Sequence, residues 1–218
     1  MKKRNYSEDI ANKIINFLNE DDWHFYFDEE QGLFKFNLAL NGIMNKIQYT
    51  IIVGNNDYNI YAISLINANI EDTEMMATMA EFICRINYGV KNGNFEMDMD
   101  DGEIRFKVYV DCADATPTAE IIRNSLYIPS LMFEHYGNGI INIMFSNFTA
   151  VEAIKVCKKS INEKFVEFSE RETFETDENI EEMFSQLEAL LDSDDDNASI
   201  SDEPKHDETI IKTNLFES

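Results

Sequence analysis

The first part of the chain places apolar residues at two different spacings. Apolar residues between Ile10 and Leu18 recur at helical spacing, and Ser7 can cap them, so residues 8–20 are predicted to form a helix. After this helix apolar and polar positions alternate, with short turn signals between the apolar runs. This alternation predicts strands at residues 23–28, 33–40, 46–53 and 58–66. Successive strands joined by short turns favour an antiparallel meander.

Helical spacing returns after the meander. Residues 71–88 are predicted to form a second helix, with an apolar stripe of Met75, Met79, Phe82, Ile83 and Ile86. Thr116 and Pro117 then suit the N-cap and first turn of a helix over residues 118–136. Pro129 lies inside this third pattern and predicts a kink or two shorter helices.

Two further signals follow the third helix. Gly137 and Gly139 predict a loop over residues 136–142. Thr149 and Glu152 have the spacing of a capping box, which predicts the start of a last core helix over residues 150–163.

The acidic stretch between the second and third helices could be a metal site or a hairpin. If Gly102 occupies the sixth position of a calcium loop, only Asp101 falls on a ligand position, so the calcium reading fails. A two-residue turn at Asp101-Gly102 explains the pattern better. It pairs Asp98 with Arg105 and Glu96 with Lys107. It also turns every apolar side chain from Phe95 to Val108 inward, including Met99 opposite Ile104.

The same stretch resembles the central signature of the YbjN-like bacterial domain family. The residues that carry the resemblance are Asn87-Tyr88-Gly89, Gly93-x-Phe95-Glu96-x-Asp98, Asp101-Gly102-x-Ile104-Arg105-Phe106-Lys107 and Val110-Asp111. The family is described as a sensory-transduction regulator, and its fold is similar to class I type III secretion chaperones. The resemblance covers roughly residues 5–160. It implies an α+β domain with helices packed on one face of an antiparallel sheet, and it supplies no catalytic residues.

The net charge of −24 disfavours nucleic acids and anionic membranes as partners. Binding to nucleic acid depends on Lys and Arg that neutralise phosphates, and the chain has no basic stripe. Anionic membrane surfaces repel an acidic chain as well. The basic start is interrupted by Glu8 and Asp9 before an apolar run forms, so it does not read as a signal peptide. Together with cysteines in an odd number and without C-x-x-C spacing, this predicts a cytoplasmic protein with mostly buried, reduced thiols.

The last part of the chain differs from the rest, so we divide the chain into a domain at residues 1–160 and an acidic extension at 161–218. The extension alone holds 19 acids and 4 bases. Residues 192–208 are predicted to be disordered because their composition buries too little apolar surface. Residues 178–191 have an apolar stripe typical of a helix that docks into a groove. This stripe consists of Ile180, Met183, Phe184, Leu187, Leu190 and Leu191. It could equally pack on its own domain or on a second copy.

No chemical motif indicates an enzyme. His24, His135 and His206 lack metal-ligand spacing, and neither a G-x-S-x-G motif nor a P-loop is present. We therefore predict no catalytic residue, no cofactor and no metal.

The favoured hypothesis is a non-enzymatic module, chaperone-like or regulatory, that binds an extended or amphipathic segment of a partner protein. Candidate partner-binding residues are Tyr26, Tyr58 and Tyr61 on the outer sheet face and, in the extension, Ile180, Met183, Phe184, Leu187 and Leu191. The alternative is a domain that self-associates, as a homodimer for instance, with the acidic extension as an interaction arm. An enzyme is the third and least favoured class.

Overall fold

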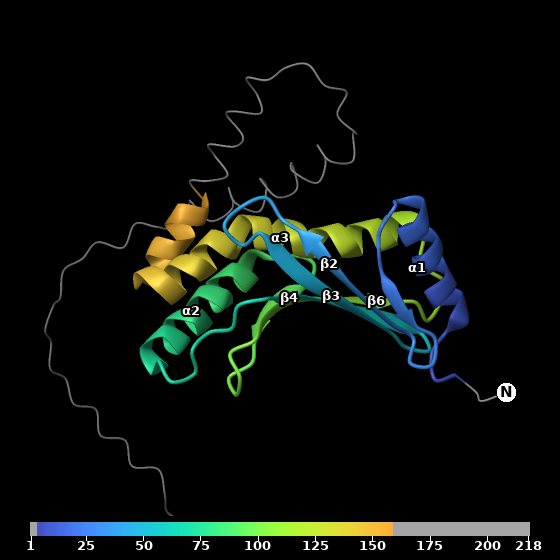
Figure 1. The fold of residues 1–218 in the computed structure, drawn as a ribbon, viewed down its shortest axis with the longest axis horizontal. Coiled ribbons are helices and arrows are strands. Elements are labelled where there is room, and N and C mark those ends of the chain that lie inside the picture. Colours follow the sequence, from blue (N-terminus) through green and yellow to red (C-terminus); the bar gives the residue numbers. More distant parts are fainter. Residues whose placement is uncertain (1–3, 159–218) are drawn as a thin grey trace, which may run out of the picture. The chain divides into compact units, whose positions relative to one another are not determined.

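The sheet contains six antiparallel strands in a computed structural model that describes residues 4–158. The strands are β1 (Tyr26–Asp28), β2 (Leu33–Ala39), β3 (Lys46–Val53), β4 (Asp57–Ser64), β5 (Asn94–Met97) and β6 (Ile104–Asp111). Their order across the sheet is β1-β2-β3-β4-β6-β5. Figure 1 labels β2, β3, β4 and β6 of this sheet. The predicted meander of the first four strands and its hairpin neighbour are therefore confirmed.

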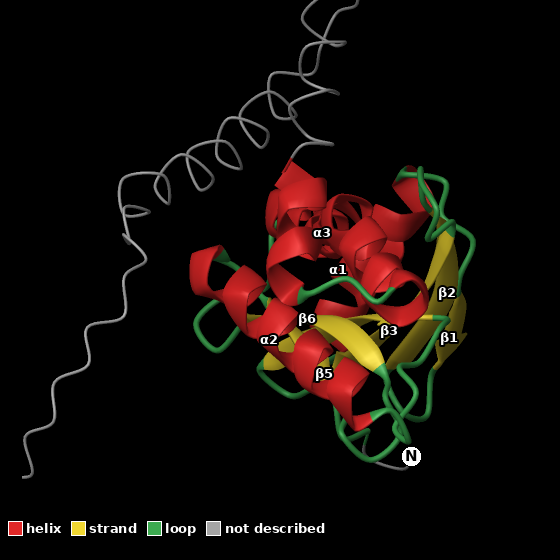
Figure 2. Cartoon of the chain, turned by 90° about the vertical axis from the view of Figure 1, so that its left-hand side faces the viewer, coloured by secondary structure: helices red, strands yellow, loops and turns green. Residues whose placement is uncertain are grey.

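The helices lie on one side of this sheet (Figure 2). They are α1 (Glu8–Glu20), α2 (Thr73–Gly89) and α3 (Ala119–Ser146), and a further helical segment covers residues 150–158. Alternate strand residues, such as Ile47, Tyr49 and Ile51 on β3, are fully buried beneath the helices. The expected α+β class, with helices on one face of an antiparallel sheet, is confirmed.

Two tyrosines of the sheet are bonded to α3. The Tyr49 hydroxyl donates to the backbone carbonyl of Leu126 at 2.7 Å, and the Tyr58 hydroxyl is 2.9 Å from Ser125 Oγ. Burial raises the pKa of Tyr58 to about 12, because the phenolate would lose its hydration there. Both tyrosines therefore join the sheet to α3 through hydrogen bonds of their neutral hydroxyl groups.

The alternative of two shorter helices at Pro129 was wrong, and so was the loop predicted over residues 136–142, whereas a kink at Pro129 stays a prediction. Helix α3 runs unbroken through Pro129, Gly137 and Gly139. Pro129 has no amide hydrogen, so the carbonyl of Ser125, four residues before it, lacks its usual helical donor. The Tyr49 hydroxyl donates to the next carbonyl, that of Leu126, and adds a bond between sheet and helix beside that point.

The two glycines of α3 are positions of close packing rather than loop residues. A Cβ atom on Gly139 would overlap the Phe82 ring of α2 and lie 2.9 Å from Cys157 Sγ. A Cβ atom on Gly137 would lie 3.2 Å from the Cβ of Met44. Neighbouring elements approach the backbone of α3 at these places, which explains why a glycine is favoured inside the helix.

Two of the three predicted helix caps are present, and α2 has a further cap that was not predicted. Ser7 accepts from the amide of Ile10, and Thr149 and Glu152 exchange the bonds of a capping box. The N-cap of α3, however, is Thr118, whose hydroxyl accepts from Ile121, and not Thr116. Asp72 caps α2 in the same way.

The register of the hairpin differs from the predicted one by two residues. Glu96 pairs with Arg105, Met97 with Ile104 and Phe95 with Phe106. Because a two-residue shift keeps every side chain on its own face, the apolar residues of the strands still turn inward. Met99 falls in the longer turn instead and is exposed, which corrects its predicted place in the core.

The remaining predictions concern the thiols and the extension. Cys157 is buried, Cys112 is partly buried and Cys84 is exposed, so the expectation of mostly buried thiols was wrong. The predicted extension at residues 161–218 lies outside the described residues.

Candidate functional site

One face of the sheet has no helix of the described chain packed on it. We call it the open face, and it is formed by the strand residues that alternate with the buried ones. Its middle row runs across all six strands through Tyr26, Lys35, Thr50, Tyr61, Lys107 and Asn94. A second row follows Leu33, Ile52, Asn59 and Tyr109.

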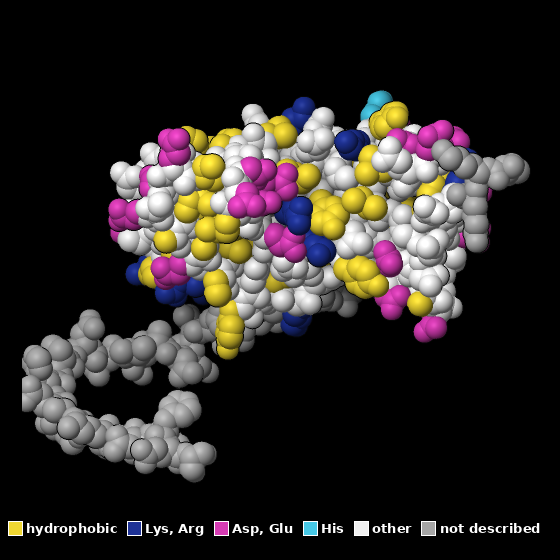
Figure 3. Space-filling view, turned by 90° about the horizontal axis from the view of Figure 1, so that it is seen from below, with side chains coloured by type: hydrophobic (Ala, Val, Ile, Leu, Met, Phe, Trp, Pro, Cys, Tyr) yellow, Lys and Arg dark blue, Asp and Glu magenta, His cyan; other side chains and the backbone are white. Residues whose placement is uncertain are grey.

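Large apolar side chains are exposed on the open face. Tyr26 is 62% exposed, Tyr109 is 54% exposed and Ile52 is 41% exposed. Figure 3 views the molecule from below the sheet of Figure 1 and shows hydrophobic side chains around a few Lys and Arg side chains near the middle of this face. Asn59 lies between Ile52 and Tyr109, and Tyr26 lies two strands from Ile52, so apolar and polar side chains alternate across this face.

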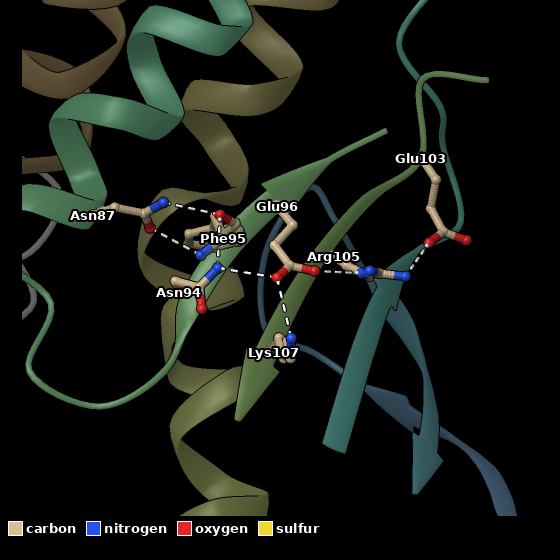
Figure 4. Close-up of polar contacts among 7 residues, drawn as sticks. All are labelled: Asn87, Asn94, Phe95, Glu96, Glu103, Arg105 and Lys107. Atoms are coloured by element: carbon tan, nitrogen blue, oxygen red, sulfur yellow. Dashed lines mark hydrogen bonds and ion pairs between the residues drawn. The ribbon is translucent and has the colours of Figure 1, made fainter. Parts of the chain in front are cut away.

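The middle of the open face holds a fixed group of charges (Figure 4). Nε of Arg105 donates to Oε2 of Glu96 at 2.8 Å, and Nη1 of Arg105 lies 3.5 Å from Glu103. Nζ of Lys107 lies 3.6 Å from the other oxygen of Glu96. The guanidinium also lies over the Tyr61 ring, 4.7 Å from its centroid, at cation–π distance. Arg105 is therefore held in one position by contacts from β5, from β4 and from the turn that precedes β6.

The carboxylate of Glu96 stays ionised because of these contacts. Partial burial by itself would raise its pKa, but the hydrogen bonds from Arg105 and Asn94 and the charge of Lys107 outweigh burial and lower the pKa below its ordinary value. Glu96, Arg105, Lys107 and Glu103 thus form an ion cluster that stabilises the sheet surface.

The three tyrosines predicted for the outer face do not share it. Tyr26 and Tyr61 lie on the open face, as expected. Tyr58 is fully buried under α3, and its predicted place on the outer face was wrong. Strand alternation explains the error, since residues 58 and 61 are three apart and must point to opposite faces. Alternation along β3 and β6 likewise places Ile52 and Tyr109 on the open face. These two residues were not predicted from the sequence.

Asn87 explains part of the sequence signature. Its side chain donates from Nδ2 to the Phe95 carbonyl and accepts the Phe95 amide at Oδ1, both at 2.8 Å (Figure 4). Phe95 lies on β5, at the edge of the sheet. An edge strand presents free backbone groups that can pair with another chain. The asparagine at the end of α2 occupies those groups and protects this edge.

The extension residues Ile180, Met183, Phe184, Leu187 and Leu191 lie outside the described residues, so their role stays a prediction.

Within residues 4–158, no three His, Cys, Asp or Glu side chains group closely enough to hold a metal ion. A shallow pocket of about 130 Å³ lies between α1 and the start of the chain, where Arg4, Tyr6 and Glu29 line it. None of the described helices has both the length and the apolar content needed to cross a membrane.

Comparison with known proteins gives one family and one solved structure. No curated protein matches the chain. A chain in a structure titled "Crystal Structure of the ExsC-ExsE Complex" is 13% identical, with a TM-score of 0.39, and the match covers 57% of this chain and 90% of that one. Residues 11–140, more than half of the chain, match the YbjN family, described as "Putative bacterial sensory transduction regulator". The chain therefore belongs to the YbjN family.

Proposed function

We propose that this protein is a non-enzymatic, cytoplasmic regulatory module whose open face binds an extended or amphipathic segment of a partner protein. The observation that supports the proposal is the exposure of Tyr26, Ile52 and Tyr109 on a sheet face that no described helix covers. Burying such side chains against a partner would contribute roughly 25 cal/mol per Å² of apolar surface.

The composition of the open face favours a protein partner. Tyrosine and arginine are, with tryptophan, enriched among the energetically important contacts of protein interfaces. Tyr61 and Arg105 are in contact with each other at the middle of this face. Since Glu96 already holds the guanidinium in place, less side-chain entropy would be lost when a partner binds there.

The family description supports the regulatory part of the proposal. A regulator acts by binding, and a flat sheet surface with apolar side chains around fixed charges suits reversible protein contacts. The predicted apolar stripe at residues 178–191 would be a second element of the same function, competing with the partner segment for apolar surface.

The experiment compares partner capture by two matched variants of the full chain. Ile52→Ser with Tyr109→Ser removes two exposed apolar side chains from the open face. Ile121→Ser with Phe145→Ser removes two that are also exposed but belong to α3. Tagged proteins are expressed at native level, and co-purifying proteins are quantified by mass spectrometry.

The expected result is a partner that is recovered with the wild type and with the α3 variant but is lost with the open-face variant. Equal recovery with all three proteins would contradict the proposal. If the only protein lost is a second copy of this chain, the function is self-association instead.

A further inference from the structure

Two loops at one end of the sheet are joined by backbone contacts. The first connects β4 to α2 (residues 65–72), and the second is the turn of the β5–β6 hairpin (residues 98–103); we call them the joined loops. The amide of Ala68 donates to the Gly102 carbonyl at 2.9 Å, and Asn67 Nδ2 donates to the Asp101 carbonyl at 3.3 Å. A Cβ atom on Gly102 would overlap the Ala68 carbonyl oxygen, so the loops are in direct contact.

The joined loops expose the apolar side chains that burial would normally favour. Ala68 is 3% exposed, whereas Leu65 in the same loop is 53% exposed. Ile66 and Ile70 are exposed too, and so is Met99 on the neighbouring turn. Burying a large aliphatic side chain stabilises a fold far more than burying an alanine. The β4–α2 loop instead buries its alanine and exposes its leucine and both isoleucines. It does so although its backbone is in direct contact with Gly102.

This exposure is specific to one end of the sheet. The loops at the opposite end, residues 29–32, 54–56 and 112–118, contain no exposed large apolar side chain. Loops positioned by a rigid scaffold commonly carry the binding residues of a protein. The β2–β3 loop at the same end also exposes one large apolar side chain, Ile43, but the joined loops expose four. The difference between the two ends therefore points to an interaction at the end that holds the joined loops.

The charge of the joined loops defines what they can bind. Their two ranges contain the acids Glu71, Asp72, Asp98, Asp100, Asp101 and Glu103 and no lysine or arginine. Figure 3 looks onto this side of the molecule and shows acidic side chains beside hydrophobic ones. Opposite charge across an interface steers association and suppresses wrong partners. An anionic lipid surface would be repelled by the same charges.

We propose that the joined loops are a second docking site, which takes a basic amphipathic segment of a partner protein. The large apolar side chains of that segment would pack on Leu65, Ile66, Ile70 and Met99, and its Lys and Arg side chains would face the six carboxylates. This site adjoins the open face at Glu103, whose carboxylate lies 3.5 Å from Arg105, but its apolar side chains belong to the loops and not to the strands.

The test uses the full chain and a fluorescent helical peptide made only of leucine and lysine, with a leucine–glutamate peptide as the charge control. Binding is measured by fluorescence anisotropy. The loop variant is Leu65→Ser, Ile70→Ser, Met99→Ser, which changes no charge. Its matched control is Ile121→Ser, Phe145→Ser, Val151→Ser, which removes three exposed apolar side chains from helical residues elsewhere. Circular dichroism and urea unfolding check that both triple variants fold.

The wild type and the control variant are expected to bind the leucine–lysine peptide and not the leucine–glutamate peptide. The loop variant should bind it about tenfold more weakly, since it loses apolar contact area. Equal binding by the loop variant and the wild type would show that net charge alone attracts the peptide and would overturn the inference, as would no binding by the wild type. Neither result affects the open-face proposal, whose variant Ile52→Ser, Tyr109→Ser is measured beside them.

Discussion

Glu96 and Arg105 face each other across β5 and β6, with carboxylate and guanidinium 2.8 Å apart. This pair belongs to the observed register of the hairpin, in which apolar pairs such as Phe95 and Phe106 turn inward beside it. It also holds the arginine against Tyr61. One ion pair thus contributes both to the architecture of the sheet and to the shape of the proposed binding surface.

The first prediction concerns pH. The folded state keeps the pKa of Glu96 below its ordinary value of 4.5, so the folded protein binds fewer protons than the unfolded chain in acid. The stability from Glu96 is therefore present above its unfolded pKa and is lost as the pH falls through its folded pKa. Urea unfolding at a series of acidic pH values should show a shallower loss of stability for Glu96→Gln than for the wild type. Parallel curves would contradict this role, and Glu30→Gln, at an exposed site, is the control.

The second prediction concerns the edge of the sheet. Asn87→Ala removes both bonds to the Phe95 backbone and should lower the free energy of unfolding by about 1–3 kcal/mol. It should also increase self-association, since the edge of β5 becomes free to pair. Urea unfolding and light scattering measure the two effects. Asn16→Ala, on the exposed side of α1, should change neither property. Unchanged stability of the Asn87→Ala protein would refute a stabilising role of the two bonds between Asn87 and Phe95.

The third prediction concerns the glycines. Gly139→Ala places a methyl group against Phe82 and Cys157 and should destabilise the fold by about 1–3 kcal/mol through overpacking. Gly89→Ala is the matched change at the end of α2, where nothing lies within 4 Å of the new Cβ. It should be neutral or slightly stabilising because alanine favours a helix over glycine. Thermal unfolding of both variants measures the difference, and equal melting temperatures would argue against close packing at Gly139.

The fourth prediction concerns thiol reactivity. Burial raises the pKa of the Cys157 thiol to about 11, whereas Cys84 is exposed on α2. Since the thiolate is the reactive form, an alkylating reagent should label Cys84 in the folded protein and Cys157 only after unfolding. Mass spectrometry of digested samples with and without urea identifies the labelled residue. Rapid labelling of Cys157 in the native protein would contradict the packing of residues 150–158 on α3.

Most of the fold could be predicted from the sequence, because the signals were local. The alternation over residues 46–53 matches β3 in both bounds, and the Ser7 cap marks the start of α1. The hairpin register could not be predicted from alternation, since a shift by two residues leaves every side chain on the same face. The turn is decided by Asp98 and Asp101, whose carboxylates accept the amides of Asp100 and Glu103.

Errors arose where a distant segment decided the outcome. Gly137 and Gly139 read as loop residues because the sequence does not show that Phe82, Met44 and Cys157 approach them. The open face was predicted only in part, since Tyr58 was assigned without its strand parity. The joined loops could not be found at all, because Ala68 and Gly102 are brought together by the pairing of β4 with β6.

Site-specific photo-crosslinking in the host cell tests the central claim, that the open face binds a partner protein, most directly. A benzophenone amino acid replaces Tyr109 on the open face or, as a control, Asn16 on α1. A crosslinked species containing a second, different polypeptide is expected from position 109 and none from position 16. No crosslink from position 109, or the same crosslinks from both positions, would contradict it.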